Sequence, residues 1–233
     1  MPNFGRLVAH DENDKNYLLR SLIEQIPLKA APGVRYYPPG PVLDQEDTSC
    51  CVGFASRARL NAAPIMVKPT IGPNGYDIYR IAVTLDEFPE NDHEAKFQDT
   101  KHLQFGTSVR AGMKALQQLG YISNYVWATS VDEIVQFLLM GFGTVIMGTT
   151  WKSNMLEPDN HDMIHARGQD VGGHCYELTG VNTTREVVRV QNSWGPTWAD
   201  HGRAWLSIKD LETLLAEDGE AVVPTEIKIQ ATK

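Results

Sequence analysis

The sequence predicts an α+β protein with two lobes, because helix-like and strand-like patterns occupy different halves of the chain. Up to Gly141, apolar residues recur at the three- and four-residue spacing of amphipathic helices. After Gly141 the apolar period changes to two, which is typical of half-buried strands. Separate runs of helices and strands, rather than alternation, indicate α+β or two lobes. We therefore expect a helical lobe at about residues 42–141 and a strand-rich lobe at about residues 142–233.

Four helices are expected in the first half. The first follows the adjacent cysteines, with Ser49 as its N-cap and Pro64 as its stop. The second spans about residues 76–87, after a Gly-Pro-Asn-Gly turn. The third opens at Gly106-Thr-Ser and closes at Gly120, and the fourth follows a capping box at residues 130–133 and ends at Gly141.

Strands are expected in the second half. The period-two segments are residues 144–147, 174–181, 187–191, 203–208 and 225–229. One short helix, at about residues 210–217, interrupts them.

Residues 1–41 read as a separate N-terminal arm. Residues 27–41 contain five prolines and two glycines, a composition that favours an extended, semi-rigid segment over a helix. We expect a structural arm packed on the lobes; the alternative is an arm that blocks a cleft between them.

The composition excludes several classes of partner. The 233-residue chain has 21 basic and 29 acidic residues, a formal charge of −8, which argues against nucleic acid or an anionic membrane as a partner. No run of eighteen apolar residues is present, and the first residues lack the apolar core of a secretory signal. The cysteines are too few for a disulfide framework, so we expect a reducing compartment or indifference to redox state. The sequence leaves the oligomeric state open.

Three short segments carry the residue types of nucleophilic catalysis. Gln45 lies six residues before Cys51, which starts a helix. His174 opens a predicted strand after Gly172 and Gly173. Asn192 ends a second strand in Gln-Asn-Ser-Trp-Gly.

These residue types fit together chemically. A thiol becomes a good nucleophile as a thiolate, which a helix N-terminus and a neighbouring imidazolium both favour. A third polar group must orient the imidazole, and the amide of Asn192 can do this. The Gln45 amide and the Cys51 backbone N–H can donate to a tetrahedral oxyanion.

In this order the segments resemble the papain-like cysteine peptidases, most closely the compact bacterial and phage members. Cys51 precedes His174 by 123 positions and Asn192 by 141 positions, close to the roughly 130–150 expected for that family. The resemblance covers about residues 41–208. It implies a helical lobe and a β-barrel-like lobe, with the active-site cleft between them and Cys51 and His174 on opposite walls.

The resemblance also implies roles for four further residues. Gly106 resembles the family's cleft-lining glycine, and Gly172 and Gly173 precede the histidine where the family walls its non-primed pocket. Trp194 would cover the hydrogen bond between Asn192 and His174. These four residues are the expected substrate-binding residues, for a polypeptide substrate.

The sequence also departs from the family pattern. Val52 replaces a large aromatic residue after the nucleophile, which changes the shape of the primed side. Cys50 raises the question of which thiol attacks; the six-residue offset from Gln45 selects Cys51. Cys175 should be a bystander, because in a strand it points away from the face of His174.

No cofactor or metal is expected. His161 and His165 lie four residues apart, but no third ligand recurs at zinc-like spacing. Two alternatives to a peptidase stay open: a catalytically silent protein of this fold, structural or associated with a phage particle, and a cell-wall peptide amidase. The expected location is the cytoplasm or a phage particle.

Overall fold

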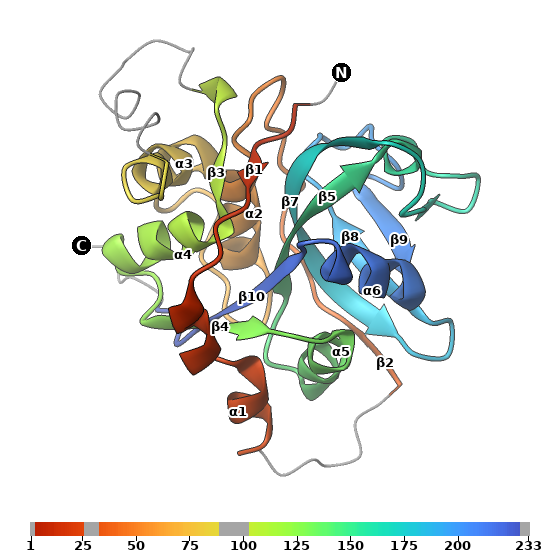
Figure 1. Cartoon of the computed structure of the whole chain (residues 1–233), viewed down its shortest axis with the longest axis horizontal. Helices are drawn as coiled ribbons and strands as arrows, with labels where there is room; N and C mark the ends of the chain where they lie inside the picture. The colour runs from red at the N-terminus through yellow and green to blue at the C-terminus, as the bar shows by residue number, and fades with distance from the viewer. Residues whose placement is uncertain (1–2, 26–32, 89–102, 229–233) are drawn as a thin grey trace.

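One side of the protein is helical and the other holds most of the strands in the computed structural model, which describes residues 3–25, 33–88 and 103–228 (Figure 1). The helical side holds α2 (Cys51–Asn61), α3 (Gly75–Val83) and α4 (Val109–Gln118). The other side holds most of an eight-stranded sheet and α6 (Ile208–Ala216). The predicted α+β class is therefore confirmed.

Helix α2 is the central helix of the helical side, and every one of its residues is buried. It packs on α3, on α4 and on strand β7 of the sheet. A Cβ at Gly53 would lie 2.2 Å from the Gly75 carbonyl oxygen, so α2 and α3 cross in direct contact. The prediction that Ser49 caps α2 is wrong: the N-cap is Cys50, and the Ser49 hydroxyl donates to the Gln104 carbonyl at 3.0 Å.

Polar side chains cap the N-termini of several other helices. Asn74 forms a complete capping box with Asp77 at the start of α3, and Ser108 caps α4 by accepting from the Ala111 N–H. Helix α3 ends at Val83, four residues before its expected end. Helix α5 (Val131–Met140) ends, as predicted, at Gly141, which has a left-handed backbone.

The capping box predicted before α5 is half present. The Ser130 hydroxyl accepts from the Glu133 N–H, as expected. The Glu133 carboxylate, however, accepts from the N–H of Thr129, one residue too early for a capping box.

The sheet has the strand order β4-β10-β5-β7-β8-β9-β6, with β2 paired to β7, and over the described residues this path stays open rather than closing into a barrel. Pairing of β5 with β7 puts Gly148 opposite Cys175, and pairing of β10 with β5 puts Glu220 opposite Gly148. These three residues therefore line up across neighbouring strands. The strands are β2 (Val34–Tyr36), β4 (Asn124–Ala128), β5 (Val145–Lys152), β6 (Met163–Ile164), β7 (Asp170–Asn182), β8 (Val187–Gln191), β9 (Arg203–Ser207) and β10 (Glu220–Thr225).

Four of the five predicted strands coincide with β5, β7, β8 and β9. The strand predicted at 225–229 is wrong over residues 226–228, which follow the end of β10 at Thr225; residue 229 lies outside the described residues. The alternation of Thr-Glu-Ile-Lys matched a surface strand, whereas the chain enters the sheet earlier, with the buried residues of β10 (Glu220–Thr225). Pro224 argues against a strand at this place in the sequence, because proline is uncommon inside sheets. Strand β4 was also missed, since its five residues lie between two strong helix signals.

Shorter helical segments among the described residues include α1 (Leu19–Ile23) and the 3₁₀ turns η1 (Glu12–Asn16) and η4 (Ser153–Met155). Helix α5 packs on α1 and on β7, whereas α6 packs on β9 and β5. Across the described residues, no helix combines the length and the apolarity that crossing a membrane requires.

The start of the chain runs between the helical side and the sheet (Figure 1). Strand β1 (Arg6–Leu7) pairs in parallel with β3 (Thr107–Ser108), just before α4. Further on, residues 34–36 are extended, as expected for the arm, and pair with β7. Residues 26–32 of the expected arm lie outside the described residues.

Candidate active site

Cys51 is the first residue of α2 and is fully buried. The unpaired N–H groups of a helix N-terminus favour a thiolate at this position. Burial nevertheless raises the pKa of the Cys51 thiol to about 11, against the opposing effect of backbone groups of Cys175, Gly5 and Val52. The thiol is therefore neutral in this conformation. Its sulfur lies beside the backbone of Cys175, the residue that follows His174.

His174 and Asn192 form a hydrogen bond between two adjacent strands. His174 lies in β7, Asn192 follows β8, and His174 Nε2 is 2.7 Å from Asn192 Oδ1. Asn192 Oδ1 also accepts the backbone N–H of Ser193 at 2.8 Å, which identifies this atom as the amide oxygen. A neutral His174 must therefore carry its proton on Nε2 and leave Nδ1 as the basic nitrogen. Nδ1 is buried without a hydrogen-bond partner, free to take a proton.

Aromatic rings enclose the His174 imidazole. The ring centroids of Trp194 and Trp151 lie 4.7 Å and 4.9 Å from that of His174. Burial lowers the pKa of His174 to about 4, and the hydrogen bond to Asn192 opposes the shift. The imidazole is therefore neutral at pH 7 while the site is closed.

Gln45 is fully buried and joins the Asn192 loop to the start of the chain. Its Oε1 accepts from the Ser193 hydroxyl at 2.7 Å, and its backbone N–H donates to the Ser193 carbonyl at 2.8 Å. Its Nε2 donates to the Thr48 carbonyl at 2.7 Å and to the Asn3 carbonyl at 3.2 Å. The amide predicted to hold an oxyanion thus already holds a peptide carbonyl of this same chain.

Residues 3–7, which we call the N-terminal segment, lie across the site. The N–H of Gly5 donates to the Gly173 carbonyl at 3.0 Å, and the Gly5 carbonyl accepts from the Thr107 N–H at 2.8 Å. The Phe4 ring meets the His174 ring edge-on, with 5.9 Å between centroids. These contacts favour the alternative of an arm that blocks the cleft over the expectation of a purely structural arm packed on the lobes.

The three glycines predicted to bind substrate all contact the N-terminal segment. A Cβ at Gly106 would lie 2.4 Å from the Gly5 carbonyl oxygen, and one at Gly173 would lie 2.0 Å from that of Arg6. A Cβ at Gly172 would lie 2.6 Å from Phe4 Cβ. A peptide backbone reaches these walls only because they lack side chains.

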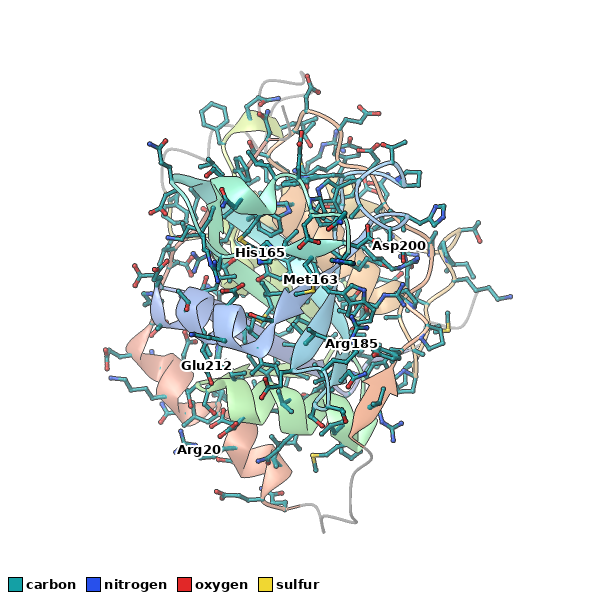
Figure 2. The ribbon with its side chains drawn as sticks, turned by 90° about the vertical axis from the view of Figure 1, so that its right-hand side faces the viewer. Arg20, Met163, His165, Arg185, Asp200 and Glu212 are labelled. Carbon is teal, nitrogen blue, oxygen red and sulfur yellow. The ribbon has the colours of Figure 1, made fainter. Side chains whose placement is uncertain are left out.

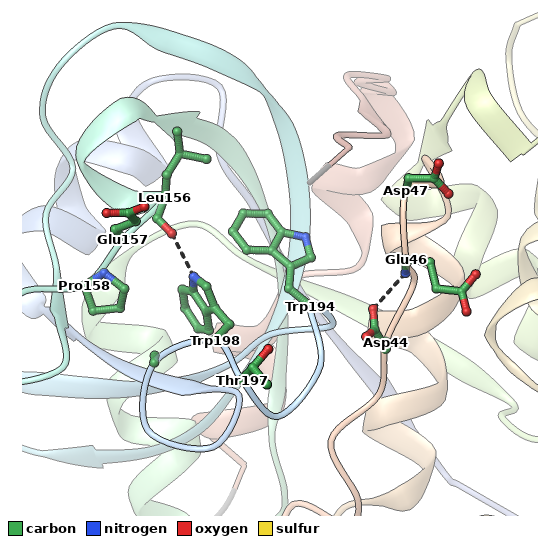
Figure 3. A pocket seen from close by; sticks show the side chains of 10 residues that line it. Asp44, Glu46, Asp47, Leu156, Glu157, Pro158, Trp194, Thr197 and Trp198 are labelled. Carbon is green, nitrogen blue, oxygen red and sulfur yellow. Dashed lines mark hydrogen bonds between the residues drawn. The ribbon is translucent and has the colours of Figure 1, made fainter. Parts of the chain in front are cut away.

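A groove of about 720 Å³ continues from Trp194, and none of residues 3–7 lines it (Figure 3). Trp194 and Trp198 supply apolar surface, and the Trp198 indole N–H donates to the Leu156 carbonyl at 2.9 Å (Figure 3). The remaining wall residues include the four carboxylates of Asp44, Glu46, Asp47 and Glu157. The groove is therefore open, aromatic at its base and acidic at its rim.

The other two cysteines differ in their surroundings. Cys50 is buried beside Phe54 and Tyr79, and burial raises the pKa of its thiol to about 12. Cys175 is buried in the same core cluster as Cys51, and burial raises the pKa of its thiol well above the ordinary value.

His165, weighed above as a metal ligand, pairs with Asp159 at 3.0 Å on the face shown in Figure 2. In the part of the chain that the structure describes, no group of three or more His, Cys, Asp or Glu side chains is placed to hold a metal ion.

Sequence reasoning missed three contributors to the site. Ser193 lies within the Asn-Ser-Trp-Gly motif, so that motif could have identified it. Arg6 and Glu220 form an ion pair beside Cys51, 2.7 Å apart, but they are 214 positions apart in the sequence and belong to no motif.

The fold corresponds to that of the papain-like C1 cysteine proteases, which are among the solved structures that superpose on the chain. One is xylellain, a cysteine protease from Xylella fastidiosa, with a TM-score of 0.63, 13% identity and 97% of each chain covered. Another is digestive procathepsin L2 from Tenebrio molitor, with a TM-score of 0.59, 14% identity, and 97% of this chain and 78% of that chain covered.

A third is the cysteine protease CMS1MS2 from Carica candamarcensis, solved with E-64. Its TM-score is 0.52 at 12% identity, and 81% of this chain and 93% of that chain are covered. No family profile and no curated protein sequence matches the chain. At these identities the likeness establishes the papain-like fold.

Proposed function

We propose that this protein is a cysteine-type endopeptidase with Cys51 as its nucleophile, His174 as its acid and base, and Asn192 as the residue that orients His174. The observation that carries the proposal is the 2.7 Å hydrogen bond from His174 to Asn192, which leaves Nδ1 as the free base. The domain would span residues 42–233, with residues 1–41 as its arm.

The reaction follows from these positions. His174 Nδ1 takes the proton of the Cys51 thiol, and the thiolate attacks the peptide carbonyl carbon. Gln45 Nε2 and the Cys51 N–H donate to the oxyanion. The imidazolium then protonates the leaving amine, and water hydrolyses the thioester with His174 as the base. Trp194 and Trp151 keep bulk water from the His174 ring.

The substrate would use contacts that the N-terminal segment now occupies. Gly106, Gly172 and Gly173 would bind the backbone of a polypeptide, and the groove beside Trp194 would hold its continuation. The Asn3 carbonyl stands in for a substrate carbonyl at Gln45 Nε2.

The peptidase would be latent in this conformation. Burial holds the pKa of Cys51 at about 11 and that of His174 at about 4, so the neutral pair prevails at pH 7. Departure of the N-terminal segment would admit water, reduce both desolvation effects and favour the thiolate–imidazolium pair.

The test compares Cys51→Ala with its neighbour Cys50→Ala. Hydrolysis of an unstructured fluorogenic polypeptide is measured for the full chain, in the native background and in a background with the segment weakened (Gly5→Ala). Loss of hydrolysis in Cys51→Ala and its retention in Cys50→Ala supports the proposal. A catalytically silent protein would show no hydrolysis in either background, and equal activity of the two variants would exclude Cys51 as the nucleophile.

A further inference from the structure

The side chain of Arg6 leaves the N-terminal segment and enters a buried pocket. Its Nε and Nη2 donate to Glu220 Oε2 at 3.0 Å and 2.7 Å, and Nη2 also donates to the Asp218 carbonyl. The side chains are 1% exposed for Arg6 and 5% for Glu220. The pocket therefore encloses a long cationic side chain and has a carboxylate at its far end.

This pocket lies beside the nucleophile. Glu220, Gly148 and Cys175 are aligned across β10, β5 and β7. A Cβ at Gly148 would lie 3.1 Å from Arg6 Nε and 3.3 Å from Arg6 Cγ, so the absence of a side chain there makes room for the arginine. The positive charge of Arg6 also opposes the rise in the pKa of the Cys51 thiol.

The pocket opens from the cleft. Arg6 follows Gly5, whose backbone bonds Gly173 and Thr107, and the Arg6 carbonyl lies against Gly173. These are the walls proposed above to bind a substrate backbone. A polypeptide that replaces the N-terminal segment would place one of its own side chains over the same opening.

Glu220 makes this pocket selective by charge. Burial raises the pKa of Glu220, and Arg6 opposes the shift. A buried carboxylate without a cation is strongly unfavourable, whereas a guanidinium satisfies both its charge and its hydrogen bonds. An apolar side chain of similar length would leave Glu220 unpaired.

We propose that Glu220 is a specificity-determining residue, and that its pocket binds an arginine side chain of the polypeptide that takes the place of the N-terminal segment. Arg6 is the internal occupant of this pocket. The assignment of the polypeptide as a substrate rests on the proposed peptidase function; the assignment of the pocket does not.

The first experiment tests the pocket without catalysis. Arg6→Ala in the full chain removes the guanidinium side chain from the pocket, and ethylguanidinium is a small cation of the same chemistry. Millimolar ethylguanidinium should therefore bind the vacated pocket and raise the Tm of this variant by about 2–4 °C by mass action. Uncharged ethylurea should not. Lys15→Ala is the matched control, because Lys15 is exposed and its ion-pair partner among the described residues is the exposed Glu12. The double variant Arg6→Ala, Glu220→Gln should lose the response.

The second experiment tests selectivity. Peptides carrying arginine or its uncharged analogue citrulline at each position in turn are compared for kcat/KM with the Arg6→Ala variant. At one position we expect at least about a 30-fold preference for arginine, the lower end for breaking a buried charge pair. Glu220→Gln, close to isosteric, should remove it.

The outcomes separate the two proposals. Hydrolysis with equal use of arginine and citrulline at every position would overturn the pocket assignment and leave the peptidase standing. Binding of ethylguanidinium without any hydrolysis would support the pocket and overturn the peptidase. No Tm response in Arg6→Ala would overturn the pocket, because it would mean that Arg6 is only an anchor whose pocket closes when it leaves.

Discussion

Replacing Gly5 with alanine should release the N-terminal segment and activate the proposed peptidase. A Cβ at Gly5 would lie 1.8 Å from the Ser49 carbonyl oxygen and 2.5 Å from its carbonyl carbon. Both atoms belong to the backbone that leads directly into α2, so the segment rather than the wall must move. Alanine cannot be accommodated at this position while the segment stays where it is.

The size of the effect follows from the contacts that are lost. A displaced segment gives up the hydrogen bonds from Gly5 N–H to Gly173 and from Thr107 N–H to Gly5, at 3.0 Å and 2.8 Å. At about 1 kcal/mol each, their loss removes about 2 kcal/mol from the closed state. Since 1.4 kcal/mol is a factor of ten, the open fraction should rise about 30-fold.

Two assays of the full chain measure this change. The first is alkylation of Cys51 by iodoacetamide, read by peptide mass mapping across pH. The native chain should react appreciably only as the pH rises toward the Cys51 pKa of about 11, because the thiolate is the reactive form. Gly5→Ala should react faster at pH 7, with its profile shifted to lower pH. The second assay, peptide hydrolysis, should rise by a similar factor.

The matched control is Gly33→Ala. Gly33 is exposed, and the described atoms that a Cβ there would meet are side-chain hydroxyls, the nearest being that of Thr183 at 3.1 Å. Equal alkylation and hydrolysis rates for Gly5→Ala and Gly33→Ala, with both proteins folded, would refute the account of latency.

Three further predictions follow from the same geometry. In the Gly5→Ala background, Gln45→Ala should lower kcat by about 10²–10³, the effect of losing one oxyanion donor; an unchanged kcat would exclude that role. Asn192→Ala should lower kcat by about tenfold or more with little change in KM, because His174 loses its orientation; steady-state kinetics decide this. In the native chain, the pKa of His174 lies near 4, below the ordinary value of about 6.5, so the unfolded state binds its proton first as the pH falls. The free energy of unfolding should therefore fall by about 3 kcal/mol between pH 6.5 and 4. Urea unfolding of the His174→Phe variant over the same pH range should show a decrease that is smaller by this amount.

The chemical identity of the site was contained in local sequence. Cys51, His174 and Asn192 could be found because each lies in a short motif that ends or begins a regular element. The spacing between the motifs then indicated the order of the papain-like fold. Cap and turn residues such as Gly141 located helix ends for the same reason: the physics that selects them acts over a few residues.

The strand-rich half was predicted less completely. Strand β4 has only a short local signal, and Asn124–Ala128 is held in place by pairing with β10, about a hundred residues later in the chain. The start of β10 was missed because Pro224 argues locally against a strand, and only its place between β4 and β5 overrides that preference.

By itself, the sequence determined the α+β class and the residue types of the proposed site, because both depend on local periodicity and on short motifs. Only the tertiary structure decided that residues 3–7 occupy the site, that Arg6 meets Glu220, and that Cys51 and His174 are held neutral. Each of these depends on groups brought together from distant parts of the chain, and on the loss of water that follows when they pack.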